Sequence, residues 1–287
     1  AGLSFGVPGS THSPGCPDQV PPDVPDGKPC RNQTVDGSSG ATGVHSSPTR
    51  NVMNDPVYLA LGLHAHQPVG NFGHVLQEHL ERVYGPFLDQ VVAGDLLPLT
   101  LHLSGPLLEW LESNHPQYLD RIGNLVTEGR VELLLAGYYE PILPALPKED
   151  RIQQIRWMQE ALSTRFGAEA KGLWLTERVW EPDLAEDLVD AGVEYVLVDD
   201  RHFAAAGLSR QGLHRPFYTE FGGKRLGVFA IDETLRYFLP FRPPAHTVSY
   251  LREIKDRGQR LAVAADDIEK FGGWPGTHEW VYERGWL

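Results

Sequence analysis

Short apolar runs alternate with helical stretches from Val57 onwards, and this alternation restricts the possible folds more than any other feature of the sequence. In the stretch 148–167, four apolar residues recur at helical spacing, and the pattern stops at Gly167. Strands that alternate with helices form a parallel sheet covered by helices on both faces. The sequence therefore predicts an α/β fold. The strand-like runs lie at 57–66, 96–104, 130–141, 172–177, 193–200 and 259–267.

Three further elements are predicted between these runs. A helical stretch covers about Gln117 to Glu128, and a second one covers 181–192, with Pro182 near its first turn. The segment 215–232 reads as a hairpin that turns at Gly222-Gly223.

Chemically capable side chains recur where the predicted strands end. An open doubly wound sheet and a closed or nearly closed barrel both fit the alternation. In a parallel barrel the carboxyl ends of the strands converge on one face, where active sites are built. Because five strand ends carry such residues, we favour the barrel over the alternative that each carboxylate only caps the next helix. These residues are His64, His66, Tyr139, Glu140, Glu177, Asp199, Asp200, Asp266 and Asp267.

Residues 1–55 are rich in Pro, Gly, Ser and Thr and contain few large apolar side chains. Such a segment buries too little apolar surface to offset the entropy lost on ordering, so we expect a disordered N-terminal extension. It lacks the apolar region of a secretory signal, and we expect a cytoplasmic location. Both cysteines, Cys16 and Cys30, lie in this segment, which excludes cysteine nucleophiles and cysteine-ligated zinc from the core.

The charge of the chain narrows the possible partners. The formal net charge is −13 at pH 7 over 287 residues, which argues against nucleic acid or an anionic membrane as the partner. No apolar run approaches the length of a membrane span. A neutral substrate remains compatible with this charge.

Acids and aromatics are concentrated in GLWLTERVWEP (172–182), where a predicted strand ends. The sequence has no GxSxG motif and no glycine-rich phosphate loop after the first strand. Two opposed carboxyl groups are what cleavage of a glycosidic bond requires, and Trp rings suit the C–H surfaces of sugars. We therefore predict that Trp174 and Trp180 flank a sugar whose anomeric carbon meets Glu177.

His64 and His66 also suggest a metal site. Side chains two residues apart on a strand share a face, and two imidazoles with a carboxylate can bind zinc or iron. However, the sequence has no HExxH motif, and we expect no further His at a strand end with suitable neighbours. We therefore favour a hydrogen bond from His66 to a polar ligand and predict no metal.

Four motifs resemble, in order, those of glycoside hydrolase family 57: HAHQPVGNF (64–72), GRVELLLAGYYEPILP (129–144), GLWLTERVWEP (172–182) and DDIEKFGGWPGT (266–277). That family contains 4-α-glucanotransferases, α-amylases, amylopullulanases and branching enzymes. The resemblance implies an incomplete parallel (β/α)7 barrel and a retaining mechanism with no metal or other cofactor. It also implies an α-glucan or maltooligosaccharide as the substrate.

The resemblance assigns roles to single residues. Glu177 corresponds to the nucleophile, and Asp267 corresponds to the general acid/base. We further expect Arg178 to help keep Glu177 ionised and Asp266 to raise the proton affinity of Asp267. Substrate contacts are predicted for His66, Gln67, Glu140, Trp174, Trp180, Asp200 and Trp274.

Two departures from the family pattern bear on these roles. Ile268 stands where the family usually has Gly, and a branched residue does not adopt the positive φ open to Gly. Family members also continue into a helical segment that covers the cleft. We therefore expect residues 56–287 to form a barrel that is shortened at its C-terminal end.

Three hypotheses for the function follow. The leading one is a retaining α-glucan-active enzyme of 4-α-glucanotransferase or α-amylase type. The second is a non-catalytic, glucan-binding remnant. The third is a metal-dependent carbohydrate hydrolase that uses His64 and His66, resembling the α-mannosidases of family 38 or the polysaccharide deacetylases.

Overall fold

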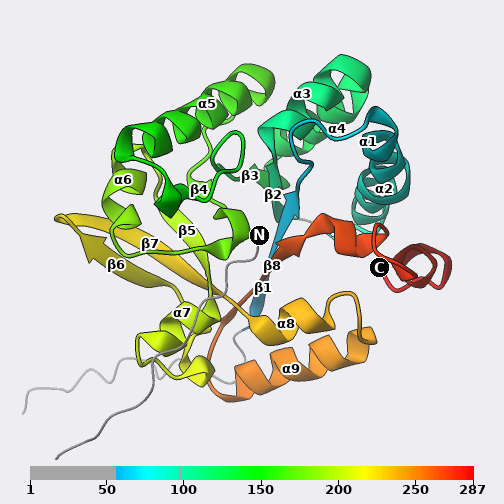
Figure 1. The fold of residues 1–287 in the computed structure, drawn as a ribbon. Helices are drawn as coiled ribbons and strands as arrows, with labels where there is room; N and C mark the ends of the chain where they lie inside the picture. Colours follow the sequence, from blue (N-terminus) through cyan, green and yellow to red (C-terminus); the bar gives the residue numbers. More distant parts are fainter. Residues whose placement is uncertain (1–55, 97) are drawn as a thin grey trace, which may run out of the picture. The chain divides into compact units, whose positions relative to one another are not determined.

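Seven parallel strands form a nearly closed barrel at the centre of the described part of the chain (Figure 1). The computed structural model describes residues 56–96 and 98–287, so the predicted N-terminal extension and both cysteines lie outside the described residues. Neighbouring strands follow the order β3-β2-β1-β8-β7-β5-β4. The strands are β1 Tyr58–Ala65, β2 Leu99–Leu103, β3 Val131–Leu133, β4 Gly172–Leu173, β5 Tyr195–Asp199, β6 Phe217–Phe221, β7 Lys224–Ile231 and β8 Leu261–Asp267.

One residue joins the two ends of this strand order. Leu135, just after β3, pairs in parallel with Leu173 of β4. The Leu135 N–H donates to the carbonyl of Gly172, and the Leu135 carbonyl accepts from the Trp174 N–H, both at 2.8 Å. The prediction of a parallel seven-stranded barrel, favoured over an open sheet, is therefore confirmed.

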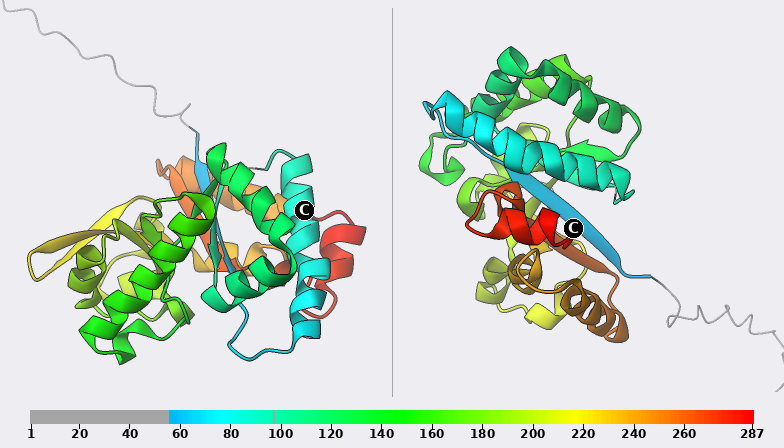
Figure 2. Two further views of the ribbon diagram at one scale, coloured as in Figure 1. Left: turned by 90° about the horizontal axis from the view of Figure 1, so that it is seen from above. Right: turned by 90° about the vertical axis from the view of Figure 1, so that its right-hand side faces the viewer.

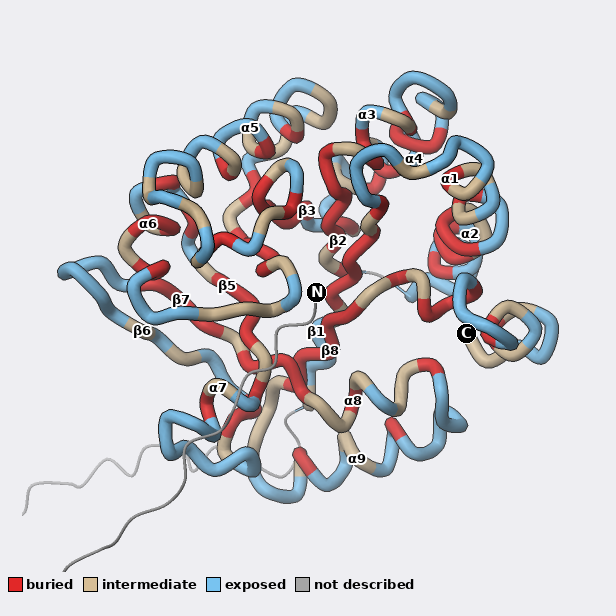
Figure 3. The backbone as a smooth tube through the Cα atoms, viewed as in Figure 1, coloured by how far each residue is buried: buried red, intermediate tan, exposed pale blue. Residues whose placement is uncertain are grey.

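Apolar side chains from three strands, and from the segments that follow two others, fill the barrel interior. One cluster gathers seven buried residues from the segments after β3 and β4 and from β5, β7 and β8. A larger cluster lies between the strands and the surrounding helices. Figure 3 shows the result: the strands are mostly buried, and the helices are exposed on their outer faces. The interior cluster consists of Leu134, Ala136, Trp174, Leu197, Ile231, Val263 and Ala265.

Helices surround the strands, and the segment after β8 packs beside α2 (Figure 2). Phe271 of that segment meets Phe87 of α2 at 5.1 Å between ring centroids. None of the described helices is long and apolar enough to cross a membrane. The α-helices are α1 Gly73–His79, α2 Gly85–Ala93, α3 Gly105–Asn114, α4 Pro116–Thr127, α5 Lys148–Phe166, α6 Leu184–Asp190, α7 Asp200–Ala205, α8 Glu233–Phe238 and α9 Pro244–Asp256.

The predicted helix from Gln117, the helix end at Gly167 and the hairpin are all present in the structure. Helix α4 covers the stretch expected from Gln117, and α5 ends at Gly167 in the left-handed conformation that favours glycine. The hairpin of β6 and β7 turns at Gly222-Gly223, where both glycines have positive φ. Two strands are shorter than predicted: β3 ends at Leu133 within the predicted run 130–141, and β4 ends at Leu173 within the predicted run 172–177.

The concern about Ile268 does not apply to this structure. Ile268 begins a 3-10 helix, Ile268–Phe271, and its side chain is buried in the core. It is not among the described non-glycine residues with positive φ. The turn after Asp267 therefore does not need glycine geometry.

Gly105, the first residue of α3, fixes the turn that carries Tyr138. Its N–H donates to the Tyr138 carbonyl at 3.0 Å, and an added Cβ would lie 2.5 Å from that oxygen. We predict that Gly105→Ala destabilises the fold by about 1–3 kcal/mol, because a backbone atom must move. Thermal unfolding followed by circular dichroism measures the effect.

The matched control is Gly73→Ala, at the first residue of α1. An added Cβ at Gly73 meets nothing within 4 Å, so the melting temperature should stay within a degree or two of the wild type. Equal melting temperatures for the two variants would contradict the close packing at Gly105.

Candidate active site

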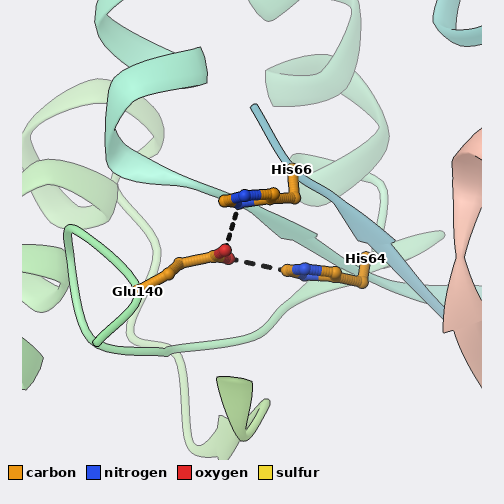
Figure 4. A group of neighbouring side chains, drawn as sticks. All are labelled: His64, His66 and Glu140. Atoms are coloured by element: carbon orange, nitrogen blue, oxygen red, sulfur yellow. Dashed lines mark ion pairs between the residues drawn. The ribbon is translucent and has the colours of Figure 1, made fainter. Parts of the chain in front are cut away.

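His64 and His66, at the carboxyl end of β1, lie on either side of the Glu140 carboxylate (Figure 4). Alternate residues of a strand share a face, and the two rings stack with centroids 5.6 Å apart. Glu140 Oε1 lies 3.5 Å from His64 Nδ1, and Glu140 Oε2 contacts His66 Nδ1. Glu140 follows β3 in a turn with φ 53°, a conformation rarely adopted by non-glycine residues. Such positions concentrate at functional sites.

His102 of β2 is a further histidine in this cluster. It is the register partner of His64, with 2.9 Å between their Nδ1 atoms, and its Nδ1 lies 3.3 Å from Glu140 Oε1. The prediction that no further His accompanies the pair is therefore wrong. The available signal was that two adjacent apolar runs each place a His near their carboxyl end.

The pKa values of these three imidazoles shift in different directions. Burial lowers the pKa of His102 to about 3 and, with the nearby His102, lowers the pKa of His64 well below its usual value. Burial also opposes a charge on His66, but the Glu140 carboxylate outweighs it and raises the pKa of His66. His66, beside the carboxylate, therefore holds a proton more readily than a free imidazole does, while His64 and His102 are neutral at neutral pH.

His64, His66 and Glu140 could also hold a metal ion. One ligand atom from each lies within 4.8 Å of the other two. Two imidazoles and a carboxylate are a donor set that zinc accepts. The residues thus fit two kinds of ligand: a metal ion, or a polar molecule that hydrogen-bonds to His66 and Glu140.

Glu177 lies four residues after the end of β4, in the short 3-10 helix Thr176–Arg178, and its side chain is exposed. Glu177 and Arg178 both have positive φ, at 54° and 56°. Arg178 pairs with Asp199 at 3.9 Å and with Asp266 at 3.6 Å. In the described part of the chain its ion-pair partners are these two aspartates, so the expected pairing with Glu177 is not found.

Asp266 and Asp267 end β8 with opposite environments. Asp266 accepts from Arg236 at 2.8 Å and from Lys270 at 2.5 Å. Although burial opposes its charge, these cations lower the pKa of Asp266. Among the described residues, no cation forms an ion pair with Asp267, and burial together with the charge of Asp266 raises its pKa. The two carboxyls thus differ in proton affinity, in the direction expected from their adjacency.

Glu269 belongs to the same cluster and was missed from the sequence. Its Oε1 accepts from Tyr84 Oη at 2.6 Å and from the His66 N–H at 3.2 Å. Burial raises the pKa of Glu269 to about 7. Gln67 donates to Tyr84 Oη at 2.9 Å and is buried, so its observed role is to support this network.

Electrostatic interactions connect four acids at the carboxyl end of the barrel, which we call the rim: Glu140, Glu177, Asp267 and Glu269. The charges of both Asp267 and Glu177 raise the pKa of Glu140, after the larger effect of burial. Asp267 and Glu269 also act on His66. Acidic groups that follow β3, β4 and β8 therefore act on one another at the carboxyl end of the barrel.

Comparison with known proteins gives the family of this chain. Residues 60–287 match the family described as Glycosyl hydrolase family 57. The chain belongs to glycosyl hydrolase family 57. The chain is 50 % identical to an α-amylase of Pyrococcus furiosus and 52 % identical to a 4-α-glucanotransferase of Thermococcus litoralis, over 82 % and 80 % of its length.

A solved structure shares the fold. The crystal structure of 4-α-glucanotransferase from Thermococcus litoralis superposes with a TM-score of 0.78 at 50 % identity over 81 % of this chain and 37 % of that one. The chain spans 36 % of the Pyrococcus α-amylase and 35 % of the Thermococcus 4-α-glucanotransferase.

Two predicted aromatic contacts of this family 57 chain lie away from the open rim. Trp174 is 1 % exposed, and its ring stacks on His64 at 4.6 Å inside the barrel. We therefore do not retain its predicted stacking on a sugar. Trp180 is partly buried and lines a separate cavity of about 500 Å³ with residues of α7 and the β6–β7 hairpin.

The last two predicted substrate contacts, Asp200 and Trp274, differ from each other in exposure. Asp200 is buried and lines a small cavity with His214 and Asp232, whereas its neighbour Asp199 pairs with Arg178 and Arg236. Trp274 is 43 % exposed and stacks on Phe241 at 5.6 Å. Among the predicted aromatic contacts, Trp274 is therefore the one with a ring open to a ligand.

The raised pKa of Glu269 predicts a pH-dependent stability. Because folding raises this pKa from 4.5 to about 7, the stabilisation that comes with its proton is complete below pH 4.5 and is lost as the pH rises through 7. Glu269→Gln removes the titration, so the stability of the wild type relative to this variant should fall between pH 4.5 and 7 by at most roughly 3 kcal/mol. Melting temperatures at four pH values measure it.

Glu283→Gln, at an exposed position, serves as the control. Its difference from the wild type should be the same at each pH. A Glu269→Gln difference that is equally flat would contradict the raised pKa.

Proposed function

We propose that the chain forms, over residues 56–287, the catalytic barrel of a retaining α-glucan-active enzyme of 4-α-glucanotransferase or α-amylase type. The observation that carries the proposal is that the charges of Glu177 and Asp267 both act on the buried Glu140. Acids that follow separate strands thus converge on one rim. The names of the relatives support α-1,4-glucan as the substrate class.

In this proposal, Asp267 starts the reaction protonated, as its raised pKa favours. It donates its proton to the glycosidic oxygen while the Glu177 carboxylate attacks the anomeric carbon, and the C–O bond breaks towards the leaving oxygen. Asp267 then takes a proton from the acceptor hydroxyl, which attacks the glycosyl ester and releases Glu177. Retaining enzymes place their two carboxyls roughly 5–5.5 Å apart, and we expect this separation here.

The other residues of the rim have supporting roles. His66 and Glu140 are in contact, and together they can donate to and accept from sugar hydroxyls. Trp274 offers an exposed ring face for a sugar. Arg236 and Lys270 hold Asp266 in its charged form, and the charge of Asp266 helps Asp267 keep its proton.

Substitution of the proposed nucleophile is the main test. Glu177→Gln keeps the shape of the exposed side chain but cannot form the ester, so turnover of maltooligosaccharides should fall by a factor of at least about 10³ with an unchanged melting temperature. The control is Glu181→Gln, an exposed glutamate four residues away, which should retain turnover. Retained turnover in Glu177→Gln would contradict the assignment of Glu177 as the nucleophile.

Incubation with maltotriose separates the reaction types. Longer oligosaccharides indicate transfer to a second glucan, and shorter products alone indicate hydrolysis. Binding of glucan without products from the wild type would favour the non-catalytic remnant. The same experiment therefore tests the leading hypothesis against the second one.

A metal-dependent hydrolase is the second candidate function, because the ligand atoms of His64, His66 and Glu140 gather within 4.8 Å. Metal analysis of the purified protein tests it. We expect substoichiometric zinc and turnover that survives a chelator. One zinc per chain, with turnover that is lost on chelation and restored by zinc, would favour the metal-dependent reaction.

A further inference from the structure

A wide groove lies between α3 and α5, on the outer side of the turn that carries Glu140. Its volume is about 890 Å³. We call it the α3–α5 groove. Its principal lining residues are Glu109, Glu112, Tyr138, Tyr139, Trp157 and Glu160.

Three aromatic rings form the floor of the α3–α5 groove. Tyr139 contacts both Tyr138 and Trp157 edge-to-face, at 4.9 and 6.2 Å between centroids. Tyr139 is 49 % exposed and Trp157 is 42 % exposed. Trp157 lies on the outward side of α5, whose buried residues include Ile155 and Met158. A cluster of exposed aromatic rings marks a binding surface more often than a single exposed residue does.

Carboxylates surround these rings. Glu109 accepts from the Tyr138 hydroxyl at 2.8 Å, and Glu112 accepts from Arg165 at 2.6 Å. Glu160 is exposed, and no ion pair of its carboxylate occurs in the described part of the chain. Acceptors beside aromatic faces suit a neutral polyhydroxylated ring, because the faces cover C–H groups while the carboxylates accept from hydroxyls. The negative charge disfavours anionic ligands.

The α3–α5 groove is continuous in sequence with the candidate active site. Tyr139 immediately precedes Glu140, so one turn presents an aromatic ring to the groove and a carboxylate to the rim. Gln154 of α5 holds this turn: its side chain accepts from the Tyr139 N–H at 3.0 Å, and its carbonyl accepts from the Tyr138 N–H at 3.2 Å.

We propose that the α3–α5 groove binds a segment of an α-glucan chain outside the catalytic rim, with Tyr139 and Trp157 as stacking platforms. The choice of ligand rests on the proposed function. The site holds a long glucan near the acids through contacts that a short oligosaccharide does not need.

Affinity electrophoresis of the full chain in gels that contain amylose tests the groove. Trp157→Ala and Tyr139→Ala should each weaken amylose binding roughly threefold to tenfold, the effect of one lost aromatic contact. Turnover of maltotriose by Trp157→Ala should stay within twofold of the wild type. The control is Tyr218→Ala on β6, a more exposed tyrosine outside the groove, which should bind amylose like the wild type.

Two results would overturn the proposal: wild type that does not bind amylose, or Trp157→Ala and Tyr139→Ala that bind it as tightly as the control. Binding of a lysine-rich peptide that depends on Trp157, with unchanged amylose binding, would likewise overturn it in favour of a basic partner. Trp157-dependent amylose binding without maltotriose turnover would instead refute the proposed function and support glucan binding by the groove.

Discussion

The hydrogen bonds of Leu135 are the constraint on which the site depends. They connect the segment after β3 with β4 and so close the ring of parallel strands. Glu140 follows one side of this connection, and Glu177 follows the other. Because both segments leave the barrel at the same end, two acids that are 37 positions apart in the sequence act on one another electrostatically. The left-handed backbone at both residues fits a site where geometry is held by its surroundings.

Burial and neighbouring charges then give residues of the same type different pKa values. Asp266 and Asp267 are adjacent, yet paired cations lower the pKa of the first, while burial and the charge of its neighbour raise the pKa of the second. The histidines divide in the same way: the pKa of His66 is raised, and the pKa of His102 is lowered to about 3. The same rim thus holds carboxyl groups of low and of high proton affinity, which is the pattern of acid/base pairs in active sites.

Much of the barrel and part of the rim could be predicted from the sequence, because strand periodicity and strand ends are local signals. The residues at 64, 66, 140 and 267 lie on the rim for this reason. Side-chain direction is not local: Asp199 faces the rim and Asp200 faces another cavity. Trp174 follows a two-residue strand, so alternation could not show that its ring enters the barrel. His102 and Glu269 join the cluster only through the register of β1 with β2 and the packing of the segment after β8.

Trapping the covalent intermediate tests the central claim most directly. The protein is incubated with a 5-fluoro-α-glucosyl fluoride, digested, and its peptides are weighed by mass spectrometry. We predict one 5-fluoroglucosyl adduct, on the Glu177 carboxylate of the peptide that contains this residue. An adduct on another carboxylate, or inverted configuration of the released sugar without any adduct, would contradict it.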